Sequence, residues 1–221
     1  MTLDNEDVLN SILASLNRIE NIRLEDIPNI DLYMDQLTTF MEEKLRKTTR
    51  YPNEDKVLTK TMINNYAKND LLPPPVRKKY SKDHLILLIF IYYFKNILSI
   101  NDIQTLLGPV KERFHTSDTD NLTLSDIYKV LCEQDAQEVE AVKEDVTRKY
   151  HIAQEAFTDA PEELKDKMQM FSFVSLLSYD VYVKKLIIEK LLDNYKEFEE
   201  TLKNQTKEQA KNDKKTKEKH Q

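Results

Sequence analysis

Glycine is nearly absent from this chain, which has 221 residues and a single glycine, Gly108. At an average usage of about 7%, roughly 15 glycines would be expected at this length. Loops that cradle phosphates and dinucleotide fingerprints need two or three glycines at fixed spacing, so both are excluded. Sandwiches and barrels need many tight turns with positive φ, which glycine usually provides. The sequence therefore predicts an all-α fold.

Composition and cysteine usage are typical of a compact cytoplasmic protein. Charged residues make up 33% of the chain and hydrophobic residues 40%, which is enough to form a core. The lone Cys132 excludes an intrachain disulfide and a thiolate-rich zinc site, and its apolar neighbours predict a packed side chain. Residues 1–9 lack the apolar segment of a signal peptide. The longest apolar run, Leu85–Phe94, is ten residues, so we expect a buried helix rather than a membrane span.

Basic residues are concentrated in one stretch of a chain whose formal net charge is −6. From Lys44 to Lys82 there are eleven basic residues and three acidic ones. A basic segment within an acidic protein is what polyanion binding requires, because a uniformly acidic surface repels phosphates. Charge by itself fits a solvated surface equally well, so the motifs must decide between these interpretations.

Apolar periodicity and helix-start signals divide the chain into helices. The predicted helices cover residues 6–20, 31–45, 60–69, 85–98 and 100–107, a segment that opens at Thr123, and residues 164–202. We expect the N-caps to be Asp31, Thr59, Ser81, Ser99 and Thr123. Pro73–Pro75 stop the third helix and Gly108-Pro109 end the fifth. Residues 116–121 are typical of a polar linker.

The C-terminal part is dominated by residues 164–202, which predict one long helix or a broken pair. Between Phe171 and Phe198 the segment is apolar almost all round, as in a helix at the centre of a core or in a subunit interface. Its aromatic side chains could also line a small-molecule pocket, although packing is their commoner use. These aromatic residues are Phe171, Phe173, Tyr179, Tyr182 and Tyr195. Residues 203–221 are polar and lysine-rich, which predicts a disordered tail.

Between Leu58 and Leu107 the chain carries helix-capping residues, a proline-rich segment and a Tyr-Ser pair in a characteristic order. The positions are Thr59, Tyr66, Leu71–Pro75, Tyr80-Ser81, Leu85, Ser99–Ile103 and Leu106-Leu107. This order resembles the MerR-type winged helix-turn-helix. In that family a capped recognition helix ends in a Gly-Leu-Leu-Pro-Pro-like turn, and a basic wing and a Tyr-Ser helix follow. The wider segment from Ile30 to Ile100 is similar to an uncharacterised bacterial family of MerR-like proteins described only as a domain of unknown function.

The resemblance implies that residues 60–69 form a recognition helix in the DNA major groove, preceded by the helix at 31–45 and followed by a short wing. The implied DNA contacts are Lys60, Thr61, Asn64, Asn65, Lys68, Arg77, Lys78 and Lys79. The chemistry of the side chains agrees with these roles. Asparagine can hold adenine with two hydrogen bonds, which suits Asn64 and Asn65 to base reading. The cations suit phosphate binding, which positions a protein without reading sequence.

No catalytic or metal-binding pattern emerges from the sequence. Glu112-x-x-His115 has the spacing of half a di-iron site, but the second copy is missing. Asp118-Thr119-Asp120 begins like a calcium loop, but Thr123 and Lys129 stand where that loop needs glycine and glutamate. The four histidines have no shared spacing with a serine or with the cysteine. We therefore expect neither an enzyme nor a resident cofactor or metal.

These observations predict four regions: an N-terminal helix at 1–29, a MerR-like module at 30–110, a helical region for dimerisation or effector binding at 111–202, and the tail at 203–221. The expected function is a transcription regulator that binds double-stranded DNA as a homodimer through its C-terminal helices. A small-molecule effector is compatible with this plan, but no residue pattern identifies one. The alternative is a protein–protein interaction module that keeps the fold without binding DNA.

Overall fold

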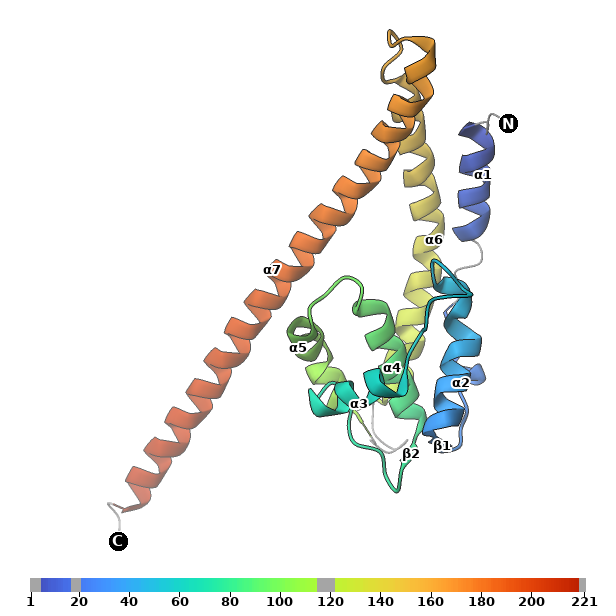
Figure 1. The fold of residues 1–221 in the computed structure, drawn as a ribbon. Coiled ribbons are helices and arrows are strands. Elements are labelled where there is room, and N and C mark those ends of the chain that lie inside the picture. Colours follow the sequence, from blue (N-terminus) through green and yellow to red (C-terminus); the bar gives the residue numbers. More distant parts are fainter. Residues whose placement is uncertain (1–4, 17–20, 115–121, 219–221) are drawn as a thin grey trace. The chain divides into compact units, whose positions relative to one another are not determined.

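Helices dominate the computed structural model, which describes residues 5–16, 21–114 and 122–218 (Figure 1). The α-helices are α1 (Asn5–Leu16), α2 (Met34–Leu45), α3 (Lys60–Lys68), α4 (Lys82–Phe94), α5 (Ile100–Lys111), α6 (Leu124–Glu155) and α7 (Glu162–Glu218). Two short 3₁₀ helices, η1 (Leu24–Asp26) and η2 (Arg46–Thr48), and two strands, β1 (Leu32–Tyr33) and β2 (Lys79–Tyr80), complete the described elements. The chain is thus mostly helical, as predicted.

The chain divides into two compact units, residues 1–181 and residues 182–221. The first unit contains every element up to the first part of α7, and the second consists of the remainder of that helix and the C-terminus. Within the described residues, no helix combines the length and the apolar character needed to span a membrane.

Helix α4 lies at the centre of the first unit. Every side chain from His84 to Tyr92 is buried, because nearly all of them are apolar. The helix begins after Ser81, whose backbone N–H donates to Nδ1 of His84 at 3.0 Å. It packs against β2, α5 and α6. Each large apolar side chain buried in this way is worth roughly 1.5–3 kcal/mol. The prediction of a buried core helix is therefore confirmed.

The two strands form an antiparallel pair in which Leu32 lies opposite Tyr80 and Tyr33 opposite Lys79. Leu32 and Tyr80 are buried on one face. This pairing shifts the start of the following helix, so the prediction that Asp31 caps it was wrong. Helix α2 begins at Met34 with Tyr33 as its N-cap, and the Tyr33 N–H donates to Oε1 of Gln36 at 2.9 Å. The pairing with β2 keeps residues 32–33 extended, and periodicity alone does not reveal such a short strand.

The predicted N-caps Thr59, Ser99 and Thr123 are confirmed, whereas two predicted C-terminal ends are wrong: α4 ends at Phe94 rather than at residue 98, and α5 does not end at Gly108-Pro109. The hydroxyls of Thr59, Ser99 and Thr123 accept hydrogen bonds from backbone amides of the first turns of α3, α5 and α6. Gly108 and Pro109, however, do not end α5, which continues to Lys111. A proline removes only one amide donor, and the Glu112 N–H still reaches the Gly108 carbonyl at 3.3 Å. The helix therefore passes through the proline within its last turn.

A tight turn formed by Val76–Lys79 precedes β2 and is called here the basic turn. The backbone amides of Val76 and Lys79 each donate to the carbonyl of the other, at 3.1 and 2.9 Å. Arg77 and Lys78 adopt left-handed backbone conformations with φ of 50° and 64°. Two-residue turns of this kind favour Asn-Gly, because only small residues tolerate positive φ well. A left-handed conformation costs a side-chain-bearing residue roughly 1–2 kcal/mol, so this turn stores strain.

A second apolar cluster joins α1, α6 and the first part of α7. Its buried members are Leu9, Val146, Tyr150, Ala153 and Phe173. Beside it, the buried Lys149 of α6 pairs with Asp145 of the same helix and with Asp180 of α7. The described part of the predicted helix 6–20 is α1, and its last residues lie outside the described ranges. Apolar contacts and one shared ammonium group therefore hold this three-helix cluster together.

Helix α7 is continuous rather than a broken pair, and it includes most of the tail for which the sequence predicts disorder. The sequence left two settings open for residues 171–198, the centre of a core or a subunit interface, and the exposure of most of these residues excludes the first for them. Of the five aromatic residues in that stretch only Phe173 is buried, whereas Phe171, Tyr179 and Tyr182 are exposed by 59–66%. The predicted linker at 116–121, His115 and the calcium-like Asp118–Asp120 lie outside the described residues.

Replacing Lys78 by glycine relieves strain in the basic turn. We expect Lys78→Gly to raise the free energy of unfolding by about 0.5–1 kcal/mol, because the gain at positive φ exceeds the entropy that glycine adds to the unfolded chain. Urea denaturation followed by circular dichroism measures the change. Lys79→Gly is the matched control and is expected to be destabilising, because Lys79 is a paired strand residue. Destabilisation by Lys78→Gly would contradict the left-handed assignment.

The carboxylate of Asp145 makes stability depend on pH. Hydrogen bonds from Lys149 and then Arg148 lower its pKa from 3.8 to about 2. A depressed pKa contributes stability above about pH 4 that is lost as the pH falls towards 2. We expect Asp145→Asn to be less stable than the wild type near neutral pH, with a smaller difference at about pH 3.

Urea midpoints of the two proteins at several pH values measure this difference. Asp166→Asn is the control, because Asp166 has no ion pair within the described ranges. A stability difference between wild type and Asp145→Asn that stays constant with pH would show that ionisation of the Asp145 carboxyl does not contribute to stability.

Candidate nucleic-acid interface

Helix α3 presents one polar face and buries the other. Ile63 is fully buried and Tyr66 is 8% exposed, and these two side chains anchor the helix to the first unit. Burial also raises the pKa of Tyr66, so its phenol stays neutral. The five residues predicted to face outward are all exposed: Lys60, Thr61, Asn64, Asn65 and Lys68. The structure therefore confirms the predicted orientation of α3, and Tyr66 has a structural role.

Both ends of α3 are fixed. At its start, the Thr59 hydroxyl accepts a hydrogen bond from the Met62 amide at 3.1 Å. At its end, Asp70 has a φ of 53°, and the next two amides donate to the Tyr66 carbonyl at 2.9 and 3.3 Å. The Lys111 ammonium of α5 then donates to Oδ2 of Asp70 at 3.0 Å. This bond explains how a side chain other than glycine is held at the left-handed C-terminus of the helix.

The polar groups on the exposed face of α3 differ in whether they already have an ion-pair or hydrogen-bond partner within the protein. Lys60 forms an ion pair with Asp35 of α2. Among the described residues, the side-chain amides of Asn64 and Asn65 and the ammonium group of Lys68 have no hydrogen-bond or ion-pair partner. A ligand that binds these three groups therefore does not have to break contacts within the protein.

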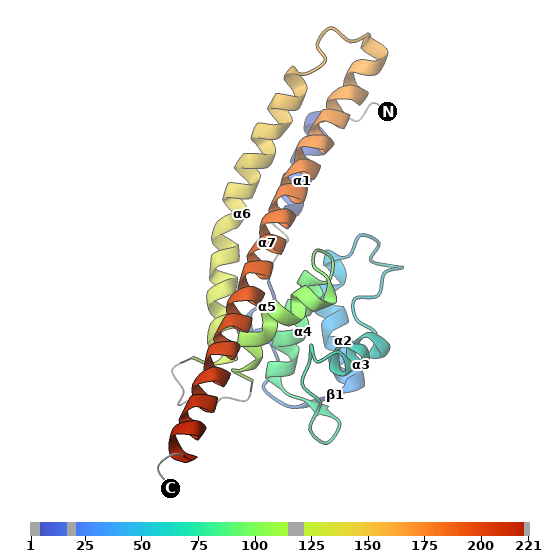
Figure 2. The ribbon, with the colours of Figure 1, turned by 90° about the vertical axis from the view of Figure 1, so that its left-hand side faces the viewer.

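The basic turn follows α3 in the chain and projects away from the helices of the first unit in both views of the fold (Figures 1 and 2). Arg77 and Lys78 at its tip are exposed and form no ion pair within the part of the chain that the structure describes. Lys79 is half-buried, and its ammonium group lies 5.2 Å from the centre of the Tyr33 ring. The exposed cations Arg77 and Lys78 therefore follow α3 closely in the chain, separated from it by residues 69–76. The Lys79–Tyr33 contact was not predicted, because it depends on the short strand β1.

A third group of cations lies in the loop between α2 and α3. Lys47, Arg50 and Lys56 are exposed there, and the guanidinium of Arg50 lies 5.3 Å from the ring centre of the exposed Tyr51. A signal for them was present in the sequence, since they belong to the basic stretch 44–82. They were absent from the predicted contacts because those were taken from the helix and the wing alone.

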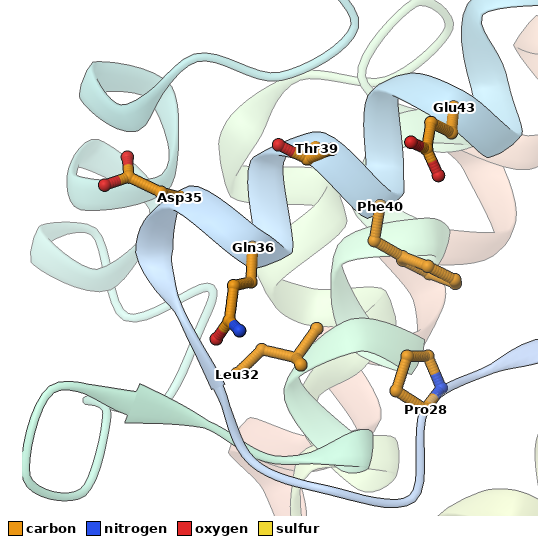
Figure 3. A pocket seen from close by; sticks show the side chains of 7 residues that line it. All are labelled: Pro28, Leu32, Asp35, Gln36, Thr39, Phe40 and Glu43. Carbon is orange, nitrogen blue, oxygen red and sulfur yellow. The ribbon is translucent and has the colours of Figure 1, made fainter.

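A shallow hollow of about 410 Å³ lies along the outer side of α2 (Figure 3). Its lining residues are Pro28, Leu32, Asp35, Gln36, Thr39, Phe40 and Glu43. The two carboxylates disfavour phosphate, so this hollow does not extend the basic surface. No group of three metal-ligating side chains occurs within the described ranges.

Sequence comparison adds one finding. Over residues 22–131 the chain matches the model of a family described as a domain of unknown function (DUF1836). No curated protein and no solved structure matches the chain. The matched range contains both strands, α2–α5 and the start of α6. The chain is therefore similar to this family over the segment that carries all the predicted DNA contacts.

Proposed function

We propose that this protein is a DNA-binding transcription regulator. In this proposal α2 and α3 act as a helix-turn-helix, α3 enters the major groove, and the basic turn serves as a short wing. The observation that carries the proposal is the exposed face of α3, where the asparagine amides and Lys68 have no partner among the described residues, together with the two unpaired cations of the basic turn that follows.

The side chains on α3 have complementary chemistry for duplex DNA. Asn64 and Asn65 occupy the middle of the exposed face, and asparagine can bind adenine through two hydrogen bonds in the major groove. Lys68 lies one turn further on and supplies a charge for a phosphate. Lys60 must exchange its ion pair with Asp35 for a phosphate contact, so its contribution is expected to be smaller.

Strain in the basic turn also supports the proposal. Arg77 and Lys78 hold positive φ angles that glycine or asparagine would adopt at lower cost. Strained backbone persists where the surrounding structure enforces it, and it clusters at functional sites. Two exposed cations at the tip of a turn gain nothing from the fold itself. Binding to phosphate provides a reason for keeping them there.

The proposed regulator is a homodimer, and the sequence of α7 supplies a seam for it. Apolar residues recur at alternating spacings of four and three, with only Lys184 as an exception: Met170, Val174, Leu177, Val181, Lys184, Ile188, Leu191, Tyr195 and Phe198. β-Branched residues at one heptad position and leucine at the other favour two-stranded coiled coils. Val174, Val181, Leu191 and Phe198 are exposed by 52–65%, so a second copy would bury them.

Neutralising the basic turn tests DNA binding without removing its fold. Arg77→Asn/Lys78→Asn deletes two charges, and asparagine tolerates positive φ. With a mixed-sequence duplex in fluorescence anisotropy, we expect weaker binding. We also expect the slope of log affinity against log salt to become shallower by roughly 1.8, because each phosphate contact contributes about 0.9.

Lys165→Gln/Lys167→Gln serves as the matched control, since it changes the net charge equally at the start of α7. Equal effects of the two variants would mean that only net charge matters, and the basic turn would then not be a DNA contact. Absence of wild-type binding at low salt would overturn the proposed function and favour a protein-interaction role.

Polar substitution in the seam tests the dimer. We expect Val181→Asp/Leu191→Asp to convert a dimer into a monomer, because buried carboxylates are not tolerated in a coiled-coil seam. Sedimentation equilibrium gives the mass directly. Tyr182→Asp is the control, because Tyr182 is equally exposed but lies outside the seam. A wild-type monomer would contradict this part of the proposal.

A further inference from the structure

A second hollow, of about 550 Å³, lies between η1, the start of α4 and the first half of α6. Its lining residues are Arg23, Leu24, Glu25, Lys82, Lys129, Cys132, Glu133 and Ala136. None of them belongs to α3 or to the basic turn. Its volume falls within the range of about 300–1,000 Å³ that is typical of small-molecule sites.

Hydrogen bonds and ring contacts fix the walls of this hollow. The Tyr128 hydroxyl donates to the Ile22 carbonyl at 2.6 Å, and Nδ2 of Asn21 donates to Oδ2 of Asp135 at 3.0 Å. These two bonds tie the segment that leads into η1 to α6, at positions on either side of Cys132. Phe90 of α4 contacts the Tyr128 ring with centroids 5.7 Å apart. The three walls are therefore in place before any ligand arrives, which lowers the entropic cost of binding.

The charges of the lining favour an anion. Arg23 precedes η1, Lys82 opens α4 and Lys129 lies in α6, and their side chains form no ion pair or hydrogen bond within the described part of the chain. Two carboxylates, Glu25 and Glu133, reduce the charge of the lining but leave it positive. The balance of three cations and two anions suits a ligand with a single negative charge.

The rest of the lining suits an apolar body. Leu24 and Ala136 contribute aliphatic surface. Burial raises the pKa of Cys132, so its thiol stays protonated and behaves as a small apolar group. A ligand in this hollow would therefore meet cations at its charged end and apolar surface elsewhere.

We propose that this hollow binds a small organic monoanion, a carboxylate or sulfonate with an apolar body. The inference does not depend on DNA binding, because it concerns different residues. Lys82 opens α4 two residues after Tyr80, so an occupant would also contact the segment that connects the basic turn to the core helix.

Dye binding to the full-length protein tests the site. The probe is anilinonaphthalene sulfonate, an aromatic monoanion whose fluorescence rises in apolar surroundings, and its uncharged counterpart is anilinonaphthalene. We expect one saturable site per chain for the sulfonate and at least tenfold weaker binding of the uncharged dye. Arg23→Gln/Lys129→Gln is expected to weaken sulfonate binding roughly tenfold. Ala136→Trp fills the hollow and is expected to abolish binding.

Two controls separate this site from other surfaces. Lys165→Gln/Lys167→Gln removes the same charge outside the hollow and is expected to leave the dissociation constant unchanged. Leu191→Asp tests for dye that binds the exposed apolar residues of the α7 seam, and it is likewise expected to leave the dissociation constant unchanged. Circular dichroism confirms that each variant is folded. Unchanged affinity in Ala136→Trp, equal binding of the uncharged dye, or loss of binding in Leu191→Asp would each overturn the proposal.

Discussion

Burial of α4 on every side determines how the first unit is built. A helix with no polar face must be enclosed, so β2, α5 and α6 pack against it. Polar groups at its C-terminal end add specific contacts. The Tyr92 hydroxyl lies 2.6 Å from Oγ1 of Thr48, and the Lys95 ammonium donates to the Val57 carbonyl at 2.9 Å. One apolar helix therefore fixes the ends of the loop between α2 and α3 as well as its own neighbours.

The candidate interface depends on this core through short connections. The basic turn is attached to α4 by β2, and β2 pairs with β1 just before α2. Helix α3 is held from the other side, since Lys111 of α5 binds Asp70 and α5 packs against α4. The exposed residues of α3 and of the turn thus have rigid supports, although they themselves make few contacts. A surface of this kind is available to a ligand and does not need to refold to bind one.

Local signals in the sequence identified the elements and missed the contacts between distant residues. Periodicity and caps located α3 with its five exposed residues, and the apolar run Leu85–Phe94 predicted α4. The strand β1 was not predicted, because a strand of two residues has no periodic pattern. Pro109 was interpreted as a helix end, although a proline in a last turn can be accommodated. The pairing of Lys60 with Asp35 and the seating of Lys79 on Tyr33 follow from tertiary packing, which neither propensity nor spacing encodes.

The basic turn lowers the stability of the folded protein, because two of its residues adopt left-handed backbone conformations. Its two left-handed residues together cost roughly 2–4 kcal/mol, a sizeable part of the roughly 5–15 kcal/mol by which folded domains are stable. The cation–π contact of Lys79 with Tyr33 returns only about 0.5–1 kcal/mol at an exposed site, and the tip cations Arg77 and Lys78 have no partner within the described ranges. The side-chain contacts of the turn within the protein therefore offset only part of this strain. In the proposed DNA complex, phosphate contacts of Arg77 and Lys78 would offset more of it, so the turn would stabilise that complex at a cost to the free protein.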